Sequence, residues 1–593
     1  MSLLNIHRLI YRDADVAWNA VTTHLLAVIR HPQAPQAIRL QAARILDEIL
    51  VIVPRNLGTA HELQGQIQSR VLHVLSQQVS VGTLVDVRRM GLETLHQILQ
   101  SSAHTFVTGW EMIFEMLASV CRPQGLAASK SLPSDSDLST PSEPATPRRV
   151  PMSLQIGDKN NVVLIRIAFQ SLTLVCDTLS SLSPEHLRLC IGTLGLFGKQ
   201  TDTNIALTAA ESLMWGVSDS IQSKRKDVEK EPEYSALWMF LLLELLGLCT
   251  DARHEVRVGA IQTLFRSLQL YGATLSLTTW DECIWKVIFP LLDSITASIR
   301  HADTPPPTAD TTATTMPGSG QSWDESKTLA LQSLSSIFSD FLTLKIIYLG
   351  SFSDAWRTFV SHVEDSFFFD SRSVSTAALR CLERALEALK NSASDATLVQ
   401  TVLDASERVW MACDEMGNKL SKSTAASALQ SPQSGMSSAR LKGMGITPFS
   451  QDSLLAFVDV IKKTREVSKV VAQNQAEGTG ESEWSLARLN RLMAILKAVI
   501  TYSNSPEYRP DIDGLTPVQV SILHCALCDH ADSIRTRLLS CPLSPLSLSR
   551  YHLRHRWSSP IFHHTPLYLS LPPSMFKVNP YRRRVRRIRR PNV

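Results

Sequence analysis

The chain has 593 residues, of which 44% are hydrophobic and 6% aromatic, and its formal net charge is +4. Residues 541–593 hold 11 Lys/Arg and no Asp/Glu, so residues 1–540 carry fewer basic residues (59 − 11 = 48) than acidic ones (55). The basic balance therefore belongs to the tail. Because the body of the chain is mildly acidic, the positive net charge does not indicate a general affinity for nucleic acid.

Cysteine usage and hydropathy indicate the cellular compartment in which the chain is expected to fold. The ten cysteines are scattered through helical patterns, which is typical of small buried side chains in a reducing compartment and predicts no disulfide framework. The first stretch, MSLLNIHRLIYRDAD, acquires charge too early for a secretory signal. The longest apolar run, Ala236–Cys249, has 14 residues and is interrupted by Glu244. We therefore expect neither a signal peptide nor a membrane span.

Polar sections divide the helical patterns of the chain. They are rich in Ser, Thr and Pro and hold too few apolar side chains to form a core, so we expect them to be disordered. In chain order we predict helical repeats at 1–121, a disordered insertion at 122–161, helical repeats at 162–300, a second disordered insertion at 301–323, helical repeats at 324–416, a flexible linker at 417–445 and C-terminal helices at 446–522.

The last section, 523–593, has a different composition from the body. Helical periodicity stops near His524, and Leu, Ser, Pro, His and Arg replace the earlier mixture. We interpret it as an aberrant, disordered basic tail, of the kind that translation of a wrong reading frame or an intron would give. The alternative is a functional Arg run, Tyr581–Pro591, that binds nucleic acid, importins or anionic lipid.

One helical phrase recurs along the body. It consists of a β-branched residue, a small residue four positions later and a leucine eight positions later. The five copies are Ile38/Ala42/Leu46, Val87/Gly91/Leu95, Ile205/Ala209/Leu213, Val256/Ala260/Leu264 and Val374/Ala378/Leu382. Without the insertions, their spacing is near the roughly 40–47 residues of HEAT and armadillo units. The fold predicted is all-α, an armadillo/HEAT-like α-solenoid.

The fourth copy, DARHEVRVGAIQTLFRSLQLYG, gives the most detailed expectations. Its apolar positions from Val256 to Leu268 share one helical stripe, and Glu255, Arg257, Gln262 and Arg266 are predicted to lie off it. We expect Asp251 to cap the first turn and Gly272 to end the last one in the left-handed conformation. Gly259 predicts that another backbone approaches closely.

The flanking segments should supply the packing partners of this helix. Pro232 suits the first turn of a preceding helix that is apolar nearly all round. In the following helix, Thr279 and Glu282 are spaced as a capping box, and Pro290 predicts a kink.

Three motifs could carry chemistry, and each falls short. GTLGLFGKQT around Gly198 and Lys199 has Thr193 where a P-loop needs glycine and Gln200 where it needs Ser/Thr. HELQG at His61 lacks the second histidine of a zincin.

The third motif, HCALCDH, offers four metal donors. They are His524, Cys525, Cys528 and His530, within seven residues. A structural zinc site usually draws ligand pairs from two separated segments, so the end of a helix is the better interpretation. We therefore predict no catalytic residue, no cofactor and no metal ion.

Thr146 is a candidate phosphorylation site. It begins the tetrapeptide Thr146-Pro147-Arg148-Arg149, a proline-directed kinase pattern inside the first insertion. Added phosphate would change the charge near a partner site. Such tetrapeptides are also common by chance.

Several longer stretches resemble one family. They are HTFVTGWEMIFEML from His104, PEHLRLCIGTLGLFGKQTDTNIALTAAESLMWGVSD from Pro184, the phrase around Val256 and DGLTPVQ from Asp513. These look like the fungal Mon-two (monensin-sensitivity) proteins, which are endosomal and Golgi peripheral membrane proteins related to the large BIG-type Arf exchange factors. The resemblance runs from near residue 1 to about Ile522 and corresponds to the C-terminal half of that family.

The resemblance implies a function as well as a fold. It implies a non-catalytic scaffold in vesicle traffic and protein sorting between endosome and Golgi, peripheral on the cytoplasmic face of those membranes. Trafficking proteins, Arf-type small GTPases and sorting machinery would be its partners, and nucleic acid would not. The alternatives are the regulatory part of a guanine-nucleotide exchange factor for Arf-type GTPases and a nuclear-transport-type solenoid, which shares the fold.

Overall fold

The computed structural model describes nine stretches of the chain. They are residues 17–55, 61–122, 153–225, 231–302, 319–369, 371–429, 450–475, 485–501 and 518–522. The chain divides into two compact units, Met1–Leu527 and Cys528–Val593, and all described residues lie in the first. The predicted tail, 523–593, lies outside the described residues.

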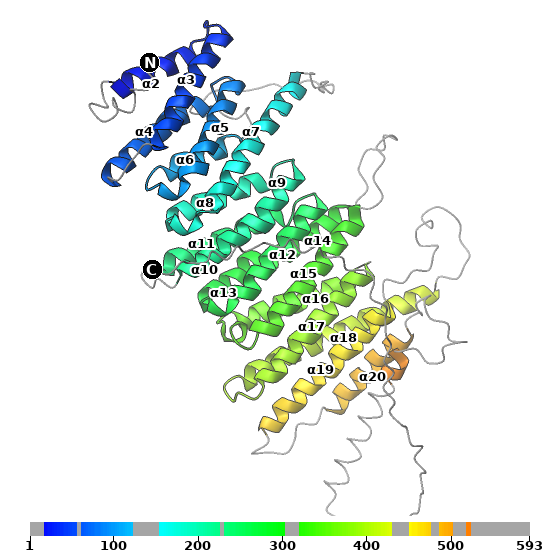
Figure 1. Cartoon of the computed structure of the whole chain (residues 1–593). Helices are drawn as coiled ribbons and strands as arrows, with labels where there is room; N and C mark the ends of the chain where they lie inside the picture. The colour runs from blue at the N-terminus through cyan, green and yellow to red at the C-terminus, as the bar shows by residue number, and fades with distance from the viewer. Residues whose placement is uncertain are drawn as a thin grey trace, which may run out of the picture. The chain divides into compact units, whose positions relative to one another are not determined.

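The described residues form two layers of helices and contain no strand (Figure 1). The first layer consists of α2 (Ala17–Arg30), α4 (His61–Val79), α6 (Trp110–Ser119), α8 (Pro184–Gly198), α11 (Glu231–Leu248), α13 (Leu277–Cys283) with π-helical η7 (Ile284–Ile288) and α14 (Phe289–Ala302), α16 (Phe352–Phe367), α18 (Val399–Leu429) and α20 (Leu486–Thr501). The second consists of α3 (Gln36–Arg55), α5 (Val85–Ser102), α7 (Ser153–Cys176), α9 (Thr203–Leu207) with π-helical η4 (Thr208–Leu213) and α10 (Met214–Lys224), α12 (His254–Tyr271), α15 (Ser319–Phe341), α17 (Arg372–Ser392) and α19 (Gln451–Gln475). Short 3₁₀ turns are η2 (Ala103–Thr105), η3 (Leu179–Ser181), η6 (Gly272–Thr274) and η8 (Ile346–Tyr348).

Successive helices alternate between the layers, so each pair forms a hairpin that contacts its neighbours. In the second layer α3 contacts α5, α5 contacts α7, and α12, α15, α17 and α19 contact one another in turn. In the first layer α4, α6, α8 and α11 do the same, as do α16, α18 and α20. Nearest-neighbour stacking of hairpins defines an α-solenoid, and the predicted armadillo/HEAT-like fold is confirmed.

All five copies of the repeated phrase lie in the second layer. They fall on α3, α5, α9 with η4, α12 and α17. The β-branched residue is buried in four of them, whereas Ile38 is 54% exposed in the first turn of α3. The small residue allows close packing, since a Cβ on Gly91 would lie 2.8 Å from Cγ2 of Val79 on α4.

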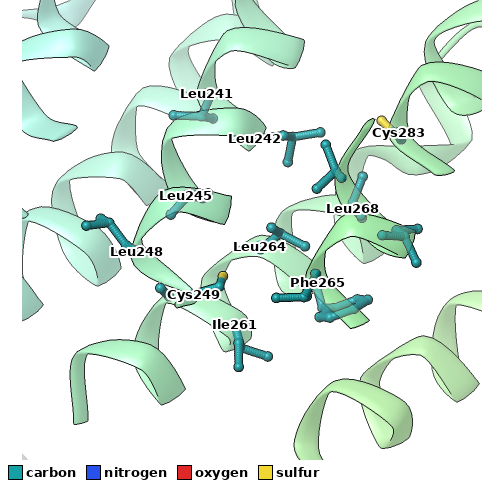
Figure 2. Packing of buried hydrophobic residues seen from close by; sticks show 14 of the residues in the cluster. Leu241, Leu242, Leu245, Leu248, Cys249, Ile261, Leu264, Phe265, Leu268 and Cys283 are labelled. Atoms are coloured by element: carbon teal, nitrogen blue, oxygen red, sulfur yellow. The ribbon is translucent and has the colours of Figure 1, made fainter. Parts of the chain in front are cut away.

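The core is best seen where α11 meets α12. Because α11 is apolar nearly all round, it must be covered on several sides, and it contacts α8, α10, α12 and α13. Figure 2 shows Leu242 and Leu245 of α11 beside Leu264 of α12 in this core. The predicted stripe of α12 is buried from Val256 to Leu268.

The role of one arginine position in the repeated phrase was not predicted. Arg39, Arg88 and Arg257 each directly follow the β-branched residue of their copy. Their guanidinium groups donate to backbone carbonyls at or just beyond the end of the preceding helix: Arg39 Nε to Ile29 O at 2.7 Å, Arg88 Nε to Val79 O at 2.9 Å, and Arg257 Nη1 to Asp251 O at 2.8 Å. Each therefore satisfies a carbonyl that the helix itself leaves unpaired.

The prediction that Arg257 lies off the buried stripe is wrong. Its side chain is fully buried, its Nε donates to Ser326 Oγ at 2.7 Å, and Nη2 donates to Ser322 Oγ at 2.6 Å. The guanidinium carbon also lies 3.8 Å from the ring centroid of Trp323. The free-energy cost of burying this charge is offset because α15 supplies both hydroxyl acceptors and the aromatic ring.

Two predicted helix caps are wrong by a few residues. The residue before α12 is Arg253, and Asp251 accepts its backbone N–H at 2.8 Å instead of capping the helix itself. For the next helix, Ser276 is the cap, since its Oγ accepts the backbone N–H of Thr279 at 3.2 Å. The helix therefore begins three residues earlier than the capping-box spacing of Thr279 and Glu282 predicts.

The predicted roles of two glycines are also wrong in detail. Gly272 has φ −57°, a right-handed conformation. It is needed because an added Cβ would lie 2.7 Å from Cζ2 of Trp280. At Gly259 the close neighbour is the Glu211 carboxyl group, not a backbone. Among the described residues the glycine with positive φ is Gly109, at 92°, which precedes α6.

Some element boundaries differ from those predicted. α7 begins inside the expected insertion 122–161, α15 begins inside 301–323, and α18 continues to Leu429, into the expected linker 417–445. α14 also extends to Ala302, and residues 123–152, 303–318 and 430–445 lie outside the described residues. Pro232 lies in the first turn of α11 as predicted. Pro290 is the second residue of α14, one residue beyond the end of the π-helical η7, and both prolines and π-bulges are common sites of helix bending. None of the described helices has both the length and the apolar content to cross a membrane.

We expect Arg257→Met to destabilise the contact between α12 and α15. The substitution leaves the Asp251 carbonyl and the Ser322 and Ser326 hydroxyls without their donor, which should cost about 2–4 kcal/mol. Hydrogen exchange should rise at the start of α15. Arg166→Met, which removes an exposed ion pair with Asp202, is the control and should change little. Unchanged exchange in Arg257→Met would contradict the assigned role.

Candidate interaction surfaces

The motifs weighed for chemistry lie in ordinary helical surroundings where the structure describes them. Gly198 ends α8, and a Cβ there would lie 2.7 Å from Cδ1 of Leu248, so this glycine allows α8 and α11 to pack. Lys199 Nζ lies 3.5 Å from a carboxylate oxygen of Glu244. His61 is the first residue of α4.

Other candidate residues fall outside the described part of the chain. They are Thr146, the four donors from His524 to His530 and the Arg run Tyr581–Pro591. Within the described residues no group of three or more His, Cys, Asp or Glu side chains could hold a metal ion.

The described cysteines have the character of core residues. Seven are free thiols: Cys121, Cys176, Cys190, Cys249, Cys283, Cys381 and Cys413. Burial raises the pKa of Cys121 and of Cys283 to about 12. Because the thiolate is the nucleophile, such burial makes these thiols unreactive.

A buried lysine of α15 contacts α14 and the segment just after α16. Lys327 is 2% exposed, its Nζ donates to Thr296 Oγ1 at 3.0 Å, and it lies 4.2 Å from the ring centroid of Phe369. Burial, together with the nearby Arg300, lowers the pKa of Lys327 to about 8. Its partners are all side chains of the same stack, which indicates a structural role.

The first surface hollow lies in the first layer, between α2 and α4, and we call it the cationic groove. Its volume is about 600 Å³. It is lined by Trp18, Asn19, Thr22, Thr23, Leu26, Ala27 and Arg30 of α2, by Ser69, Arg70, His73, Val74 and Gln77 of α4, and by Met112 of α6. Among the described residues that line it, the charged and titratable ones, Arg30, Arg70 and His73, are basic.

The second hollow lies in the other layer of the same hairpins, between α3 and α5, and we call it the acidic groove. Its volume is about 370 Å³. It is lined by Arg44, Asp47, Glu48, Val51 and Ile52 of α3 and by Met90, Glu93, Thr94 and Gln97 of α5. Its charged lining residues are the carboxylates Asp47, Glu48 and Glu93 and the guanidinium of Arg44, so acidic groups predominate.

Asp47 is the half-buried carboxylate of the acidic groove. Burial raises its pKa from 3.8 to about 6, although a hydrogen bond from Gln78 Nε2, at 2.9 Å, acts in the other direction. The Oε1 atom of Gln78 is buried without a hydrogen-bond partner. Sequence reasoning missed both grooves, because it reads the buried stripe of each helix and not the exposed positions between neighbours.

We expect Asp47→Asn to stabilise the protein at neutral pH. Since the folded-state pKa is raised, the folded chain binds more protons than the unfolded chain between about pH 4 and 6, and stability falls as pH rises through that window. A permanently neutral amide avoids this loss, with a gain of about 1–2 kcal/mol above pH 6 that shrinks toward pH 4.

Thermal unfolding at pH 7.5 and pH 4.5 measures this difference. Glu48→Gln, at an exposed carboxylate of the same groove, is the control and should shift Tm little at either pH. A Tm gain of Asp47→Asn that is equal at both pH values would refute the assignment.

Two family models match the chain. One, described as the C-terminal region of Mon2 protein, matches residues 224–410, which includes α11 to α17. The other, described as Mon2/Sec7/BIG1-like, HDS, matches residues 60–129, which includes α4 to α6. The second match contains the α4 and α6 side of the cationic groove.

Curated relatives agree with these models. The Protein MON2 homolog of Drosophila melanogaster is 28% identical over 455 residues, which is 71% of this chain and 24% of that protein. The Protein MON2 homolog of Homo sapiens is 26% identical over 425 residues, 65% of this chain and 22% of that protein. The chain thus spans about a quarter of the length of these relatives.

Two further similarities are weaker. The brefeldin A-inhibited guanine nucleotide-exchange protein 2 of Arabidopsis thaliana is 31% identical over 115 residues, 18% of this chain and 6% of that protein. Among solved structures, importin beta aligns over 84% of this chain and 64% of its own, at 9% identity and a TM-score of 0.22. A TM-score that low supports no argument.

Proposed function

The chain belongs to the Mon2 family, and from that premise we propose that it is a non-catalytic scaffold in vesicle-mediated transport and protein sorting between endosome and Golgi. The observation that carries the proposal is the two-layer stack itself. It presents exposed helix surfaces and two grooves, which suit the binding of other proteins. On this proposal the chain acts on the cytoplasmic face of those membranes as a peripheral protein. Trafficking proteins, including Arf-type GTPases and sorting machinery, are its partners.

A second function is the regulatory part of a guanine-nucleotide exchange factor. The similarity to the Arabidopsis exchange protein and the model shared with Sec7 and BIG1 favour it. The phrase around Val256, which carries part of the family resemblance, forms the buried stripe of α12. Its apolar side chains therefore serve packing and offer no group for catalysis of nucleotide exchange. We therefore place exchange activity second.

Proximity labelling of the endogenous protein tests the trafficking role. We expect Golgi and endosomal sorting factors to be enriched over a labelling enzyme expressed alone, because a scaffold holds its partners within labelling distance. Enrichment of nuclear-pore components instead would contradict the proposal and favour a nuclear-transport solenoid.

A nucleotide-release assay separates scaffold from exchange factor. We expect the purified chain to leave GDP release from Arf-type GTPases at its intrinsic rate, with an authentic exchange factor as the positive control. Clear acceleration by the chain would defeat the non-catalytic proposal.

A further inference from the structure

We propose that the acidic groove binds a segment of a partner protein that carries an arginine or lysine beside apolar side chains, with the cationic group seated on Asp47. This deepens the proposed scaffold function, on which it rests, by giving one partner site its chemistry. It is supported by the size of the groove, its accessible apolar residues, the position of Asp47 and a buried acceptor beside that carboxylate.

The acidic groove has room for side chains of another molecule. Its volume of about 370 Å³ falls within the range of roughly 300–1,000 Å³ typical of ligand pockets. Its two walls, α3 and α5, are neighbours in the second layer and contact each other directly. The groove is therefore a fixed feature of two packed helices.

Apolar side chains are accessible along the groove. Ile52 is 43% exposed, and Val51 and Met90 are half-buried. The flexible side chain of Met90 can adapt to different partners. Apolar side chains of a partner can leave water against these residues, as they do at the centre of other protein interfaces.

Asp47 is the carboxylate on which the site depends. It is half-buried, so water screens its charge less than that of an exposed residue, yet it lines the groove and can be reached from it. Burial raises the pKa of Asp47 to about 6, which means that its ionised form is costly in the folded chain. Carboxylates held at such a cost are typical of functional sites, and a cation bound to this one offsets the cost.

A buried acceptor without a donor lies beside Asp47. Gln78 of α4 is fully buried, and its Nε2 donates to Asp47 Oδ1 at 2.9 Å. The Oε1 atom of the same carboxamide has no hydrogen-bond partner among the described residues, although buried polar atoms nearly always have one. A guanidinium or ammonium group on Asp47 brings several N–H donors to this pair and supplies what it lacks.

The other charged residues of the groove have a smaller part. Glu48 is exposed on α3 and adds a second carboxylate. Glu93 already pairs with Arg89 at 3.0 Å, and Arg44 adds a positive charge. The preference for a cation therefore rests on the half-buried carboxylate and its neighbouring acceptor, and not on the net charge of the groove.

Fluorescence anisotropy with two labelled peptides tests the proposal on the full chain. One is a helix-forming peptide of about 12 residues with a central arginine and with Leu or Ile three and four positions to either side. The other has citrulline, a neutral residue of the same shape, in place of the arginine. We expect saturable binding of the Arg peptide and at least about tenfold weaker binding of the citrulline peptide, because only the first brings a charge to the carboxylate.

The affinity for the Arg peptide should depend on pH. Arginine stays charged throughout, whereas a proton must leave Asp47 before the cation binds when the pH is below the pKa of about 6. Affinity should therefore rise about tenfold from pH 5 to pH 7.5 as this carboxyl ionises. The groups that face Asp47 are Arg44 and Glu48 of α3, Gln78 of α4, and Glu93 and Thr94 of α5. The Asp47→Asn variant separates its titration from that of the two glutamates.

Variants assign the binding to the groove. Asp47→Asn should weaken binding of the Arg peptide at least about tenfold and remove the rise between pH 5 and pH 7.5. Since the same substitution is expected to stabilise the fold, this loss cannot come from unfolding. Gln97→Trp, at an exposed lining position, should block the groove without changing charge. Glu233→Gln, at an exposed carboxylate of α11, is the matched control and should leave the affinity unchanged.

Several outcomes would overturn the proposal. They are equal binding of both peptides, no saturable binding of the Arg peptide, or an affinity unaffected by Asp47→Asn and by Gln97→Trp. Binding of arginine amide alone as tightly as the Arg peptide would assign the groove to a small cation instead of a partner segment. None of these results bears on the proximity labelling, so failure of this inference and failure of the scaffold function can be told apart.

Discussion

The structure depends on burial of apolar helix faces between neighbouring hairpins. α11 shows the constraint most clearly, because its side chains are apolar on nearly every side and a single hairpin could not cover them. Contact with α8, α10, α12 and α13 removes those faces from water. Each hairpin therefore needs the next one, and a stack follows from the sequence pattern of its units.

Arginines of the repeated phrase pair with backbone carbonyls that such stacking buries. Packing helices side by side in two layers covers the carbonyls at helix ends, which have no partner within their own helix. Arg39, Arg88 and Arg257 donate to such carbonyls from one position of the repeated phrase. Arg257 also reaches Ser322 and Ser326 across the second polar insertion of the sequence, and so connects two hairpins that the chain separates widely.

The outer surface obeys a weaker constraint, and there the two layers differ. Positions that face outward can carry either charge without loss of the core. Among the described lining residues, the charged ones are basic in the groove between α2 and α4 and mainly acidic in the groove between α3 and α5.

The sequence by itself determined the helical class, the repeat and the buried stripe, because apolar spacing records which face of a helix leaves water. It did not determine which polar residues join that core. Arg257 looks exposed on its own helix, and only α15, distant in sequence, supplies the groups that allow its burial. The cap at Ser276, the crowding at Gly272 and both grooves were likewise decided by tertiary structure, since each depends on how close a neighbouring helix lies.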